Sequence, residues 1–277
     1  MDAAEVDLSA AAVVALKATE QAKSRLAPVT DPLRRRLAWT MAVDTLVALS
    51  AAVGHVVVVS NQPALASRLG RLGLRVEVVP EGRARGLNGA LTLGAEVART
   101  AGFATVLASV GDLPALRPES VRRVLDVAGE FPRAALADAT GVGTTMLVAR
   151  GVDLDPRFQG RSAAAHHTSG AHLLAGERLT DARRDVDTEV DLADALRLGV
   201  GRSTAPLVDP TTGRLGTYQV VTTTQWTTED GTPLAVTGSG HRVRLPTAAL
   251  ADGLRTPRLG QRLHAVLAAG EVRSAWL

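Results

Sequence analysis

The first two thirds of the chain alternate short apolar runs with longer stretches of helical periodicity. Val13 to Leu16 and Val56 to Val59 are continuous apolar runs, as in strands that are covered on both faces. Between them, apolar residues from Asp31 to Ala52 recur near the helical period, which predicts a long helix. This alternation predicts an α/β fold with a mostly parallel sheet. The pattern predicts further helices at 63–72, 87–100, 118–129 and 188–198, and further strands at 75–79, 105–110, 146–149 and 183–186.

Two later segments differ from this alternation. Pro156 to Gly170 is polar and is predicted to be a loop that faces a substrate. After Gly199 the pattern becomes all-β, with short strands predicted at 218–221, 233–236, 242–245, 262–266 and 272–276. Short strands at this spacing are typical of a small barrel of the oligonucleotide/oligosaccharide-binding type. We therefore expect a first domain at 10–202, a linker rich in Pro, Thr and Gly at 203–213, and a barrel domain at 214–277.

The composition is that of a globular protein with an aliphatic core. Hydrophobic residues make up 46% and aromatic residues 3%, and there is no cysteine. The lack of cysteine excludes disulfide scaffolds, zinc ribbons, iron–sulfur sites and thiol nucleophiles. No apolar run reaches the roughly 18 residues of a membrane helix, and Met1 to Ser9 carries three acids and no base, unlike a secretory signal. We expect a cytoplasmic protein with no membrane partner.

Lysine is rare in this chain, and both lysines stand close together. The net charge is +3, and among 31 basic residues only Lys17 and Lys23 are lysines. They lie in the loop after the first predicted strand, a usual position for phosphate binding in an α/β sheet. This loop lacks the glycines of a Walker loop or a dinucleotide fingerprint. Phosphate binding is one interpretation, and two lysines on a mobile surface loop are the other.

Three aspartates form a candidate metal site. Asp185 and Asp187 are two residues apart in a predicted strand, so their side chains should share one face. Asp112 follows the apolar strand that ends at Val110. Converging carboxylates repel one another unless a cation lies between them, and Mg²⁺ accepts such ligands. Alternatively, the pair lies in solvent near a helix N-terminus, and Asp112 caps a turn.

Several polar residues are weaker candidates. Asn88 begins a predicted helix, and its amide could reach a ribose or a base. Thr144 and Ser162 are hydroxyl donors in glycine-rich or basic loops, suited to a carboxylate or phosphate ligand. His166 and His167 could bind an anion or lie in solvent, and we expect them to lie in solvent. No histidines stand at metal-binding spacing, and no Gly-x-Ser-x-Gly nucleophile is present.

Together these segments resemble a known family. The motifs are VVALKATEQAKSRLAP at 13–28, GLNGAL at 86–91, GDLPAL at 111–116, GVGTTML at 141–147, DPRFQGRSAAAHH at 155–167 and RRDVDTEVDL at 183–192. In this order they resemble the phosphoenolpyruvate or 2-phospho-L-lactate guanylyltransferases of coenzyme F-420 biosynthesis. The resemblance covers about residues 12–202. It implies a nucleotidyltransferase fold with helices on both faces of the sheet. It also implies an enzyme that joins GTP to a phospho acid and releases pyrophosphate.

The resemblance also implies roles for individual residues. Asp112, Asp185 and Asp187 would hold Mg²⁺, and Lys17, Lys23, Ser24 and Arg25 would hold the triphosphate. Lys17, Lys23 and Asp112 would also act in catalysis, and Asn88 remains a candidate for the nucleotide. The phospho acid would contact Thr144, Ser162 and either Gln159 or Gly160. The excess of Arg over Lys indicates a GC-rich genome, as in actinobacteria, where the family is expected to use phosphoenolpyruvate.

The barrel lies outside the usual family chain. Its segment at 248–267 resembles a cold-shock domain, but it lacks the alternating aromatics on which such domains stack bases. We expect no nucleic-acid binding. The barrel is expected to stabilise the enzyme or to mediate its association into a homo-oligomer. Two other functions remain open: guanylyl or cytidylyl transfer to a molybdenum cofactor, and nucleic-acid binding beside a decayed enzyme domain.

Overall fold

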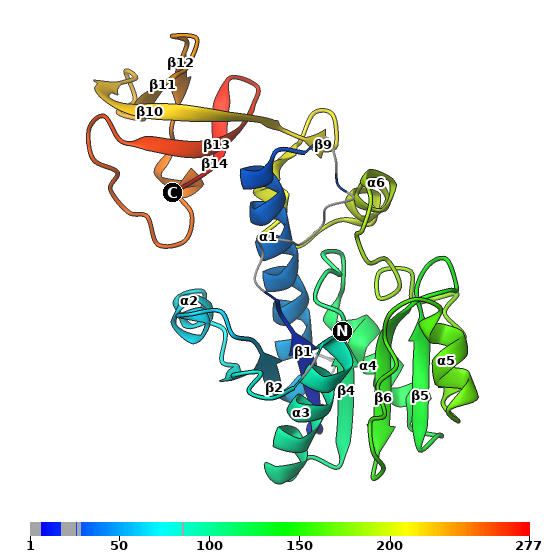
Figure 1. The fold of residues 1–277 in the computed structure, drawn as a ribbon. Helices are drawn as coiled ribbons and strands as arrows, with labels where there is room; N and C mark the ends of the chain where they lie inside the picture. The colour runs from blue at the N-terminus through cyan, green and yellow to red at the C-terminus, as the bar shows by residue number, and fades with distance from the viewer. Residues whose placement is uncertain (1–6, 18–25, 27–28, 85) are drawn as a thin grey trace. The chain divides into compact units, whose positions relative to one another are not determined.

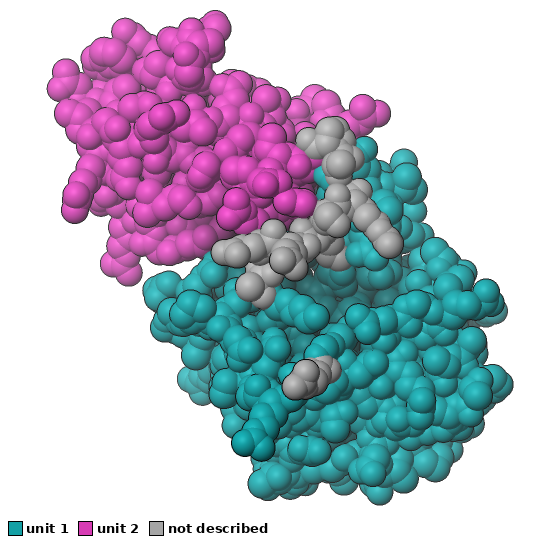
Figure 2. Space-filling model, in the orientation of Figure 1, with its two compact units in different colours: residues 1–26, 38–201 teal, residues 27–37, 202–277 magenta. Residues whose placement is uncertain are grey.

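The computed structural model describes residues 7–17, 26, 29–84 and 86–277 (Figure 1). The chain divides into two compact units, one of residues 1–26 and 38–201 and one of residues 27–37 and 202–277 (Figure 2). The long helix α1 (Asp31–Ser50) therefore begins in the second unit and ends in the first. No helix in the described ranges is both long and apolar enough to cross a membrane.

The first unit is built on a mixed, mostly parallel sheet, as predicted. Its central strand β1 pairs in parallel with β2 on one side and with β4 on the other. Strand β6 runs antiparallel to both of its neighbours, β4 and β5. The sheet order is β3-β2-β1-β4-β6-β5-β7. The strands are β1 (Asp7–Ala15), β2 (Val53–Val59), β3 (Glu77–Val79), β4 (Thr105–Ser109), β5 (Arg133–Ala137), β6 (Thr144–Arg150) and β7 (His172–Leu173).

Helices cover both faces of this sheet. Alternate residues of β1 belong to different cores, because side chains alternate across a strand. Ala12 and Val14 pack with residues of α1 and α4, whereas Ala11 and Val13 pack with residues of α3. The packing of α3 is close: a Cβ at Gly94 would lie 2.3 Å from Val13 Cγ1. Besides α1, the helices are α2 (Leu65–Arg71), α3 (Gly86–Thr100), α4 (Pro118–Ala128), α5 (Ser162–Thr168) and α6 (Glu189–Leu198).

Two local predictions for this unit are wrong. Arg183 lies in a turn and residues 184–186 have no regular secondary structure, and the polar segment 156–170 contains helix α5. Arg183 contacts the chain at the end of β5 mainly through its side chain, whose guanidinium donates to the carbonyls of Ala137 and Asp138. One backbone hydrogen bond joins the same segments, from the N–H of Ala139 to Arg183 O at 2.8 Å. A single backbone hydrogen bond makes no ladder, so residues 183–186 form no strand.

The second unit contains the predicted barrel. Its strands close in the order β10-β11-β12-β14-β13 around small and branched aliphatic side chains, as a core almost without aromatic residues requires. The segment predicted as a linker holds a short 3-10 helix (Ala205–Leu207) and β8 (Val208–Asp209), which pairs with β9 (Arg214–Leu215). The predicted domain boundaries stay a prediction. The barrel strands are β10 (Thr217–Thr227), β11 (Pro233–Thr237), β12 (Arg242–Arg244), β13 (Arg262–Ala268) and β14 (Glu271–Trp276).

The first turns of α1 contact the barrel residues of the same unit. Arg36 Nη1 lies 2.5 Å from Asp252 Oδ2, and its guanidinium carbon lies 5.5 Å from the centre of the Trp276 ring. Only 9% of the Arg36 side chain and 7% of Trp276 are exposed. A charge that is shielded in this way depends on its partners. Arg36 therefore belongs structurally to the barrel unit.

Candidate active site

The candidate residues gather at one edge of the first unit's sheet. Strands β1 and β4 run in parallel, so the residues that follow them emerge at the same edge. Strand β6 runs in the opposite direction, so its first residue, Thr144, lies at this edge as well. The N–H of Val110 donates to the carbonyl of Thr145 at 3.0 Å, which joins the two elements where β4 ends. Ligands of open α/β sheets bind beyond the carboxyl ends of the parallel strands.

Lys17 lies two residues after the end of β1 and is exposed. Its backbone is fixed from both sides of the residue: the N–H of Leu16 donates to Val59 O at 3.0 Å, and Gln62 Nε2 donates to Lys17 O at 2.9 Å. Two hydrogen bonds thus fix the backbone at the start of the lysine-containing loop, where Lys17 is exposed. The other candidates of that loop, Lys23, Ser24 and Arg25, lie outside the described residues.

Asp112 lies in a tightly anchored turn after β4. Gly111 passes so close to β1 that a Cβ there would lie 2.7 Å from Leu16 Cδ2. On the other side, the N–H of Leu113 donates to Thr45 Oγ1 at 3.0 Å. The half-buried Asp112 is thereby placed next to the end of β1. It also receives a backbone hydrogen bond, from the N–H of Val186 to its carbonyl at 3.2 Å.

This hydrogen bond joins the segment of Asp185 and Asp187 to the turn that holds Asp112. Val186 is fully buried, between the half-buried Asp185 and the exposed Asp187. Burial therefore alternates over these three residues, and the predicted convergence of the two carboxylates stays a prediction. Two backbone hydrogen bonds position it, one from Val186 to Asp112 and one from Ala139 N–H to Arg183 O at 2.8 Å.

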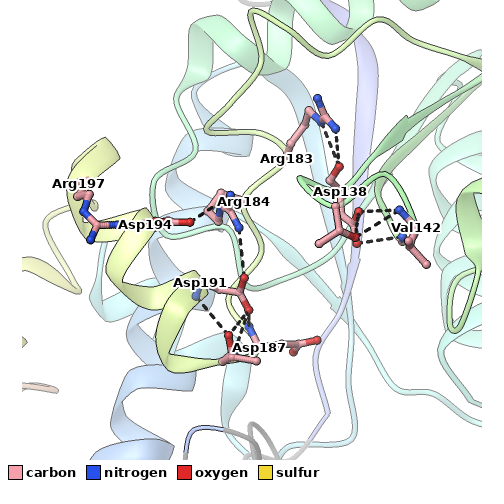
Figure 3. Close-up of polar contacts among 11 residues, drawn as sticks. Asp138, Val142, Arg183, Arg184, Asp187, Asp191, Asp194 and Arg197 are labelled. Carbon is pink, nitrogen blue, oxygen red and sulfur yellow. Dashed lines mark hydrogen bonds and ion pairs between the residues drawn. The ribbon is translucent and has the colours of Figure 1, made fainter.

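Two arginines lock the same segment in place (Figure 3). Arg183 reaches the β5–β6 loop, where Nη2 donates to Asp138 O at 2.7 Å. Arg184 points the other way, with ion pairs of 3.2 Å to Asp191 and 3.3 Å to Asp194 of α6. Thr188 and Asp191 form a reciprocal capping box at the start of α6. The segment that contains Asp185 and Asp187 is thus attached to the β5–β6 loop on one side and to the capped helix α6 on the other, which fixes its backbone.

The three aspartates offer carboxylate oxygens, the ligands that Mg²⁺ prefers. Within residues 7–17, 26, 29–84 and 86–277, however, no three His, Asp or Glu side chains are arranged as a complete metal site. Mg²⁺ commonly uses one or two protein carboxylates and takes its other ligands from phosphates and water. The donor set therefore fits a divalent ion that arrives with a nucleotide, rather than one held by protein ligands alone.

Thr144 is delivered to the edge by a self-contained loop. The Asp138 carboxylate accepts from the N–H of Val142 at 3.0 Å and of Gly143 at 2.9 Å, and from Thr140 Oγ1 at 2.8 Å (Figure 3). A Cβ at Gly143 would lie 2.5 Å from Asp138 Oδ2, so the bonded carboxylate leaves room only for glycine. Asp138 thus sets the position at which β6 begins.

Helix α5, which begins at Ser162, contacts Thr144 and the loop before it, and here one prediction is wrong. The N–H of Ala163 donates to Val142 O at 3.1 Å, and His166 Nδ1 lies 3.0 Å from Thr144 Oγ1. His166 is fully buried rather than solvated, and burial lowers its pKa from 6.5 to about 4. His167, by contrast, is exposed as predicted. If this segment had been predicted as a helix, the i, i+4 spacing of Ser162 and His166 would have placed both residues on one helix face.

Asn88 holds the chain that leads to α5. Its Nδ2 donates to Phe158 O at 3.2 Å, and the Phe158 N–H donates to Asn88 Oδ1 at 2.8 Å. Gln159 and Gly160 follow, both exposed and both with positive φ, of 97° and 60°. The Asn88 amide therefore has one N–H and one oxygen lone pair left for any nucleotide. Its described contacts link it to the candidate acid-binding loop.

The chain is similar in sequence and in fold to known proteins. A phosphoenolpyruvate guanylyltransferase of Thermomonospora curvata is 45% identical over 207 residues, which cover 73% of this chain and 90% of that protein. One from Streptomyces avermitilis is 47% identical over 198 residues, covering 70% of this chain and 91% of that protein. A candidate nucleotide-diphospho-sugar transferase from Desulfovibrio desulfuricans G20 shares the fold, with a TM-score of 0.55 at 16% identity over 71% of this chain and 90% of that one.

A sequence model of a family described as "Guanylyl transferase CofC like" matches residues 10–206. This range contains the sheet of the first unit, except the first three residues of β1, and the described candidate residues at its edge. It ends before the barrel strands, which begin at Thr217. From Ala10 to the 3-10 helix that precedes the barrel, the chain belongs to the guanylyl transferase CofC-like family.

Proposed function

We propose that this protein transfers the guanylyl group of GTP to phosphoenolpyruvate, with release of pyrophosphate. The carrying observation is the gathering of Lys17, Asp112, the segment of Asp185 and Asp187, and Thr144 at one sheet edge. Family membership and the names of the relatives support the same reaction. The product, enolpyruvyl-diphosphoguanosine, would belong to coenzyme F-420 biosynthesis.

The reaction is a substitution at phosphorus. A phosphate oxygen of phosphoenolpyruvate attacks the α-phosphorus of GTP and forms a new P–O bond. The bond from the α-phosphorus to the bridging oxygen breaks, and that oxygen leaves on pyrophosphate with the electron pair. The nucleophile is already an anion, so no general base is required. The protein therefore contributes chiefly by holding two anionic substrates in line and by balancing their charge.

We assign the charge-balancing role to the aspartates and lysines. Asp112, Asp185 and Asp187 would hold Mg²⁺, which when bound supplies positive charge against the phosphate oxygens of GTP. The Val186–Asp112 hydrogen bond supports this assignment, because it places both carboxylate segments together. Lys17 would reach the triphosphate from the end of β1, with Lys23, Ser24 and Arg25 completing that contact.

The phospho acid would lie on the β6 side of the edge. Thr144 and Ser162 supply hydroxyl groups from two elements that are hydrogen-bonded together. Gln159 or Gly160 would add a contact from the loop before α5. Hydrogen bonds from neutral donors suit a carboxylate, which has several lone pairs to satisfy. The metal would be left to the phosphates.

The test is pyrophosphate release from GTP and Mg²⁺ with phosphoenolpyruvate, 2-phospho-L-lactate or 3-phosphoglycerate as acceptor. We expect the highest kcat/KM with phosphoenolpyruvate, and lower values when ATP or CTP replaces GTP. A matched control omits the acceptor. Turnover with none of the three acids would refute the proposal. A cytoplasmic location and assembly into a homo-oligomer stay predictions, to be tested by fractionation and by light scattering.

A further inference from the structure

Two side chains in the first unit hold the backbone of the loop before α5. His166 binds the N–H of Arg157, through Nε2 at 2.8 Å. Asn88 binds both the N–H and the carbonyl of Phe158. These residues come from α5 and α3, far apart in sequence, and meet on consecutive residues of the loop. Neither is required by the transfer chemistry, so their arrangement calls for another explanation.

The hydrogen bonds of His166 define which ring nitrogen carries the proton. Because the N–H of Arg157 donates to Nε2, that nitrogen must offer its lone pair. The proton of the neutral ring is therefore on Nδ1. Nδ1 lies 3.0 Å from Thr144 Oγ1, so the ring donates and the hydroxyl accepts. The hydrogen of the Thr144 hydroxyl is then free to point to a third group.

Phe158 strengthens the same attachment. Its side chain is 3% exposed, and its ring meets the His166 ring edge to face, with centroids 5.1 Å apart and planes at 76°. Three backbone atoms and one aromatic ring thus fix residues 157 and 158. Edge-to-face contacts of buried rings stabilise a structure beyond their burial alone.

The fixed residues support a strained turn. Gln159 has a φ of 97°, a conformation that residues with a Cβ rarely adopt, and Gly160 follows with a φ of 60°. Such strain persists only where the surroundings impose it, and it is often found at ligand sites. Here the imposed conformation directly follows the positions held by Asn88 and His166. Both strained residues are exposed, at the place where the acid is proposed to bind.

We propose that His166 and Asn88 are positioning residues for the carboxylate of the acid substrate: both hold loop 157–160 in its strained form, and His166 turns the Thr144 hydroxyl hydrogen toward the substrate. This inference rests on the proposed function. It also gives Asn88 a different role from the nucleotide contact predicted from sequence. The ligand chemistry is that of a carboxylate on a small phosphorylated acid, bound by neutral donors.

The test compares His166→Phe with His166→Gln. Phenylalanine keeps an aromatic ring against Phe158 but removes both hydrogen bonds, whereas the glutamine amide can still accept from Arg157 and donate to Thr144. We expect the KM for phosphoenolpyruvate to rise about 10-fold or more in His166→Phe, the effect of losing one or two hydrogen bonds. His166→Gln should recover part of this loss. The KM for GTP should stay within about twofold, since the affected atoms bind only the acid.

The matched control is His167→Phe, the same substitution at the exposed neighbour, which should leave both KM values unchanged. A second test is the pair Thr144→Val and His166→Phe. Because His166 acts partly through Thr144, the double variant should raise the acid KM by less than the product of the single effects. Asn88→Ala should raise the acid KM, and Asn88→Asp, which keeps the acceptor for Phe158 N–H, should raise it less.

The outcomes are distinct. An unchanged acid KM in His166→Phe, or an equal rise in both KM values, would overturn the inference. If His166→Phe does not fold, His166→Leu, which also lacks both hydrogen bonds, takes its place under the same criteria. A rise confined to the GTP KM in Asn88→Ala would return Asn88 to the nucleotide site and overturn its role here. Wild-type protein without turnover would instead refute the proposed function, on which this inference rests.

Discussion

Acid should destabilise the first unit through the side chain of His166. This ring is fully buried, and burial lowers its pKa from 6.5 to about 4. The charge of Asp155 raises this pKa, whereas the charges of Arg133 and Arg157 lower it. Between these two pKa values the unfolded chain binds a proton that the folded chain does not. The stabilisation is therefore complete above pH 6.5 and is lost as the pH falls toward 4. At about 1.4 kcal/mol per pKa unit, the loss amounts to about 3 kcal/mol at most.

The assay is urea unfolding of the wild type and His166→Gln between pH 7.5 and 4.5, followed by circular dichroism. Glutamine does not titrate, and the other ionisable groups are shared, so subtraction isolates His166. The difference in unfolding free energy should change by about 1 kcal/mol per pH unit below pH 6. Parallel curves for the two proteins would refute the reasoning. So would an NMR titration in which the His166 resonance, assigned from the variant, titrates near 6.5.

Three further predictions concern the proposed site and the barrel. Asp187→Asn should lower the rate of pyrophosphate release on the order of 100-fold or more with little change in Tm; near-normal turnover at saturating Mg²⁺ would remove this exposed residue from the site. Gly143→Ala should raise the acid KM and lower the Tm, because the new Cβ would lie 2.5 Å from Asp138 Oδ2; an unchanged KM would contradict this. Arg36→Met should destabilise the second unit by about 1–3 kcal/mol, because it removes the shielded ion pair between Arg36 and Asp252; tryptophan fluorescence during urea unfolding would measure the change, and an unchanged midpoint would contradict the prediction.

The fold could be predicted largely because its strands carry strong local signals. Val56 to Val59 is a β-branched run typical of a buried strand, and it forms the last four residues of β2. The helix at Asp31 has a clear start and a long apolar stripe, and its predicted span differs from α1 by two residues. Local pattern and tertiary structure agree in these elements.

The sequence indicated candidate residues for the site by their chemical type, but not the tertiary contacts that hold them. Asp112 and Val186 meet through one backbone hydrogen bond, which has no sequence signal. The segment 183–186, expected to be a strand, is attached to the end of β5 mainly by the Arg183 side chain, a tertiary contact that propensity does not include. His166 was misplaced for a related reason: its segment is polar, and only the packing of α5 buries the ring.

The reversed direction of β6 has an evolutionary consequence. Since β6 starts where β4 ends, the proposed acid contacts all lie in one stretch, from the Asp138 loop to His166. The aspartates proposed for the metal lie outside that stretch, at 112 and 185–187. A single continuous exchange or insertion between residues 138 and 166 can therefore change which acid is accepted without altering the carboxylates. Descendants of such a chain can acquire new acceptors while the chemistry at phosphorus is inherited intact.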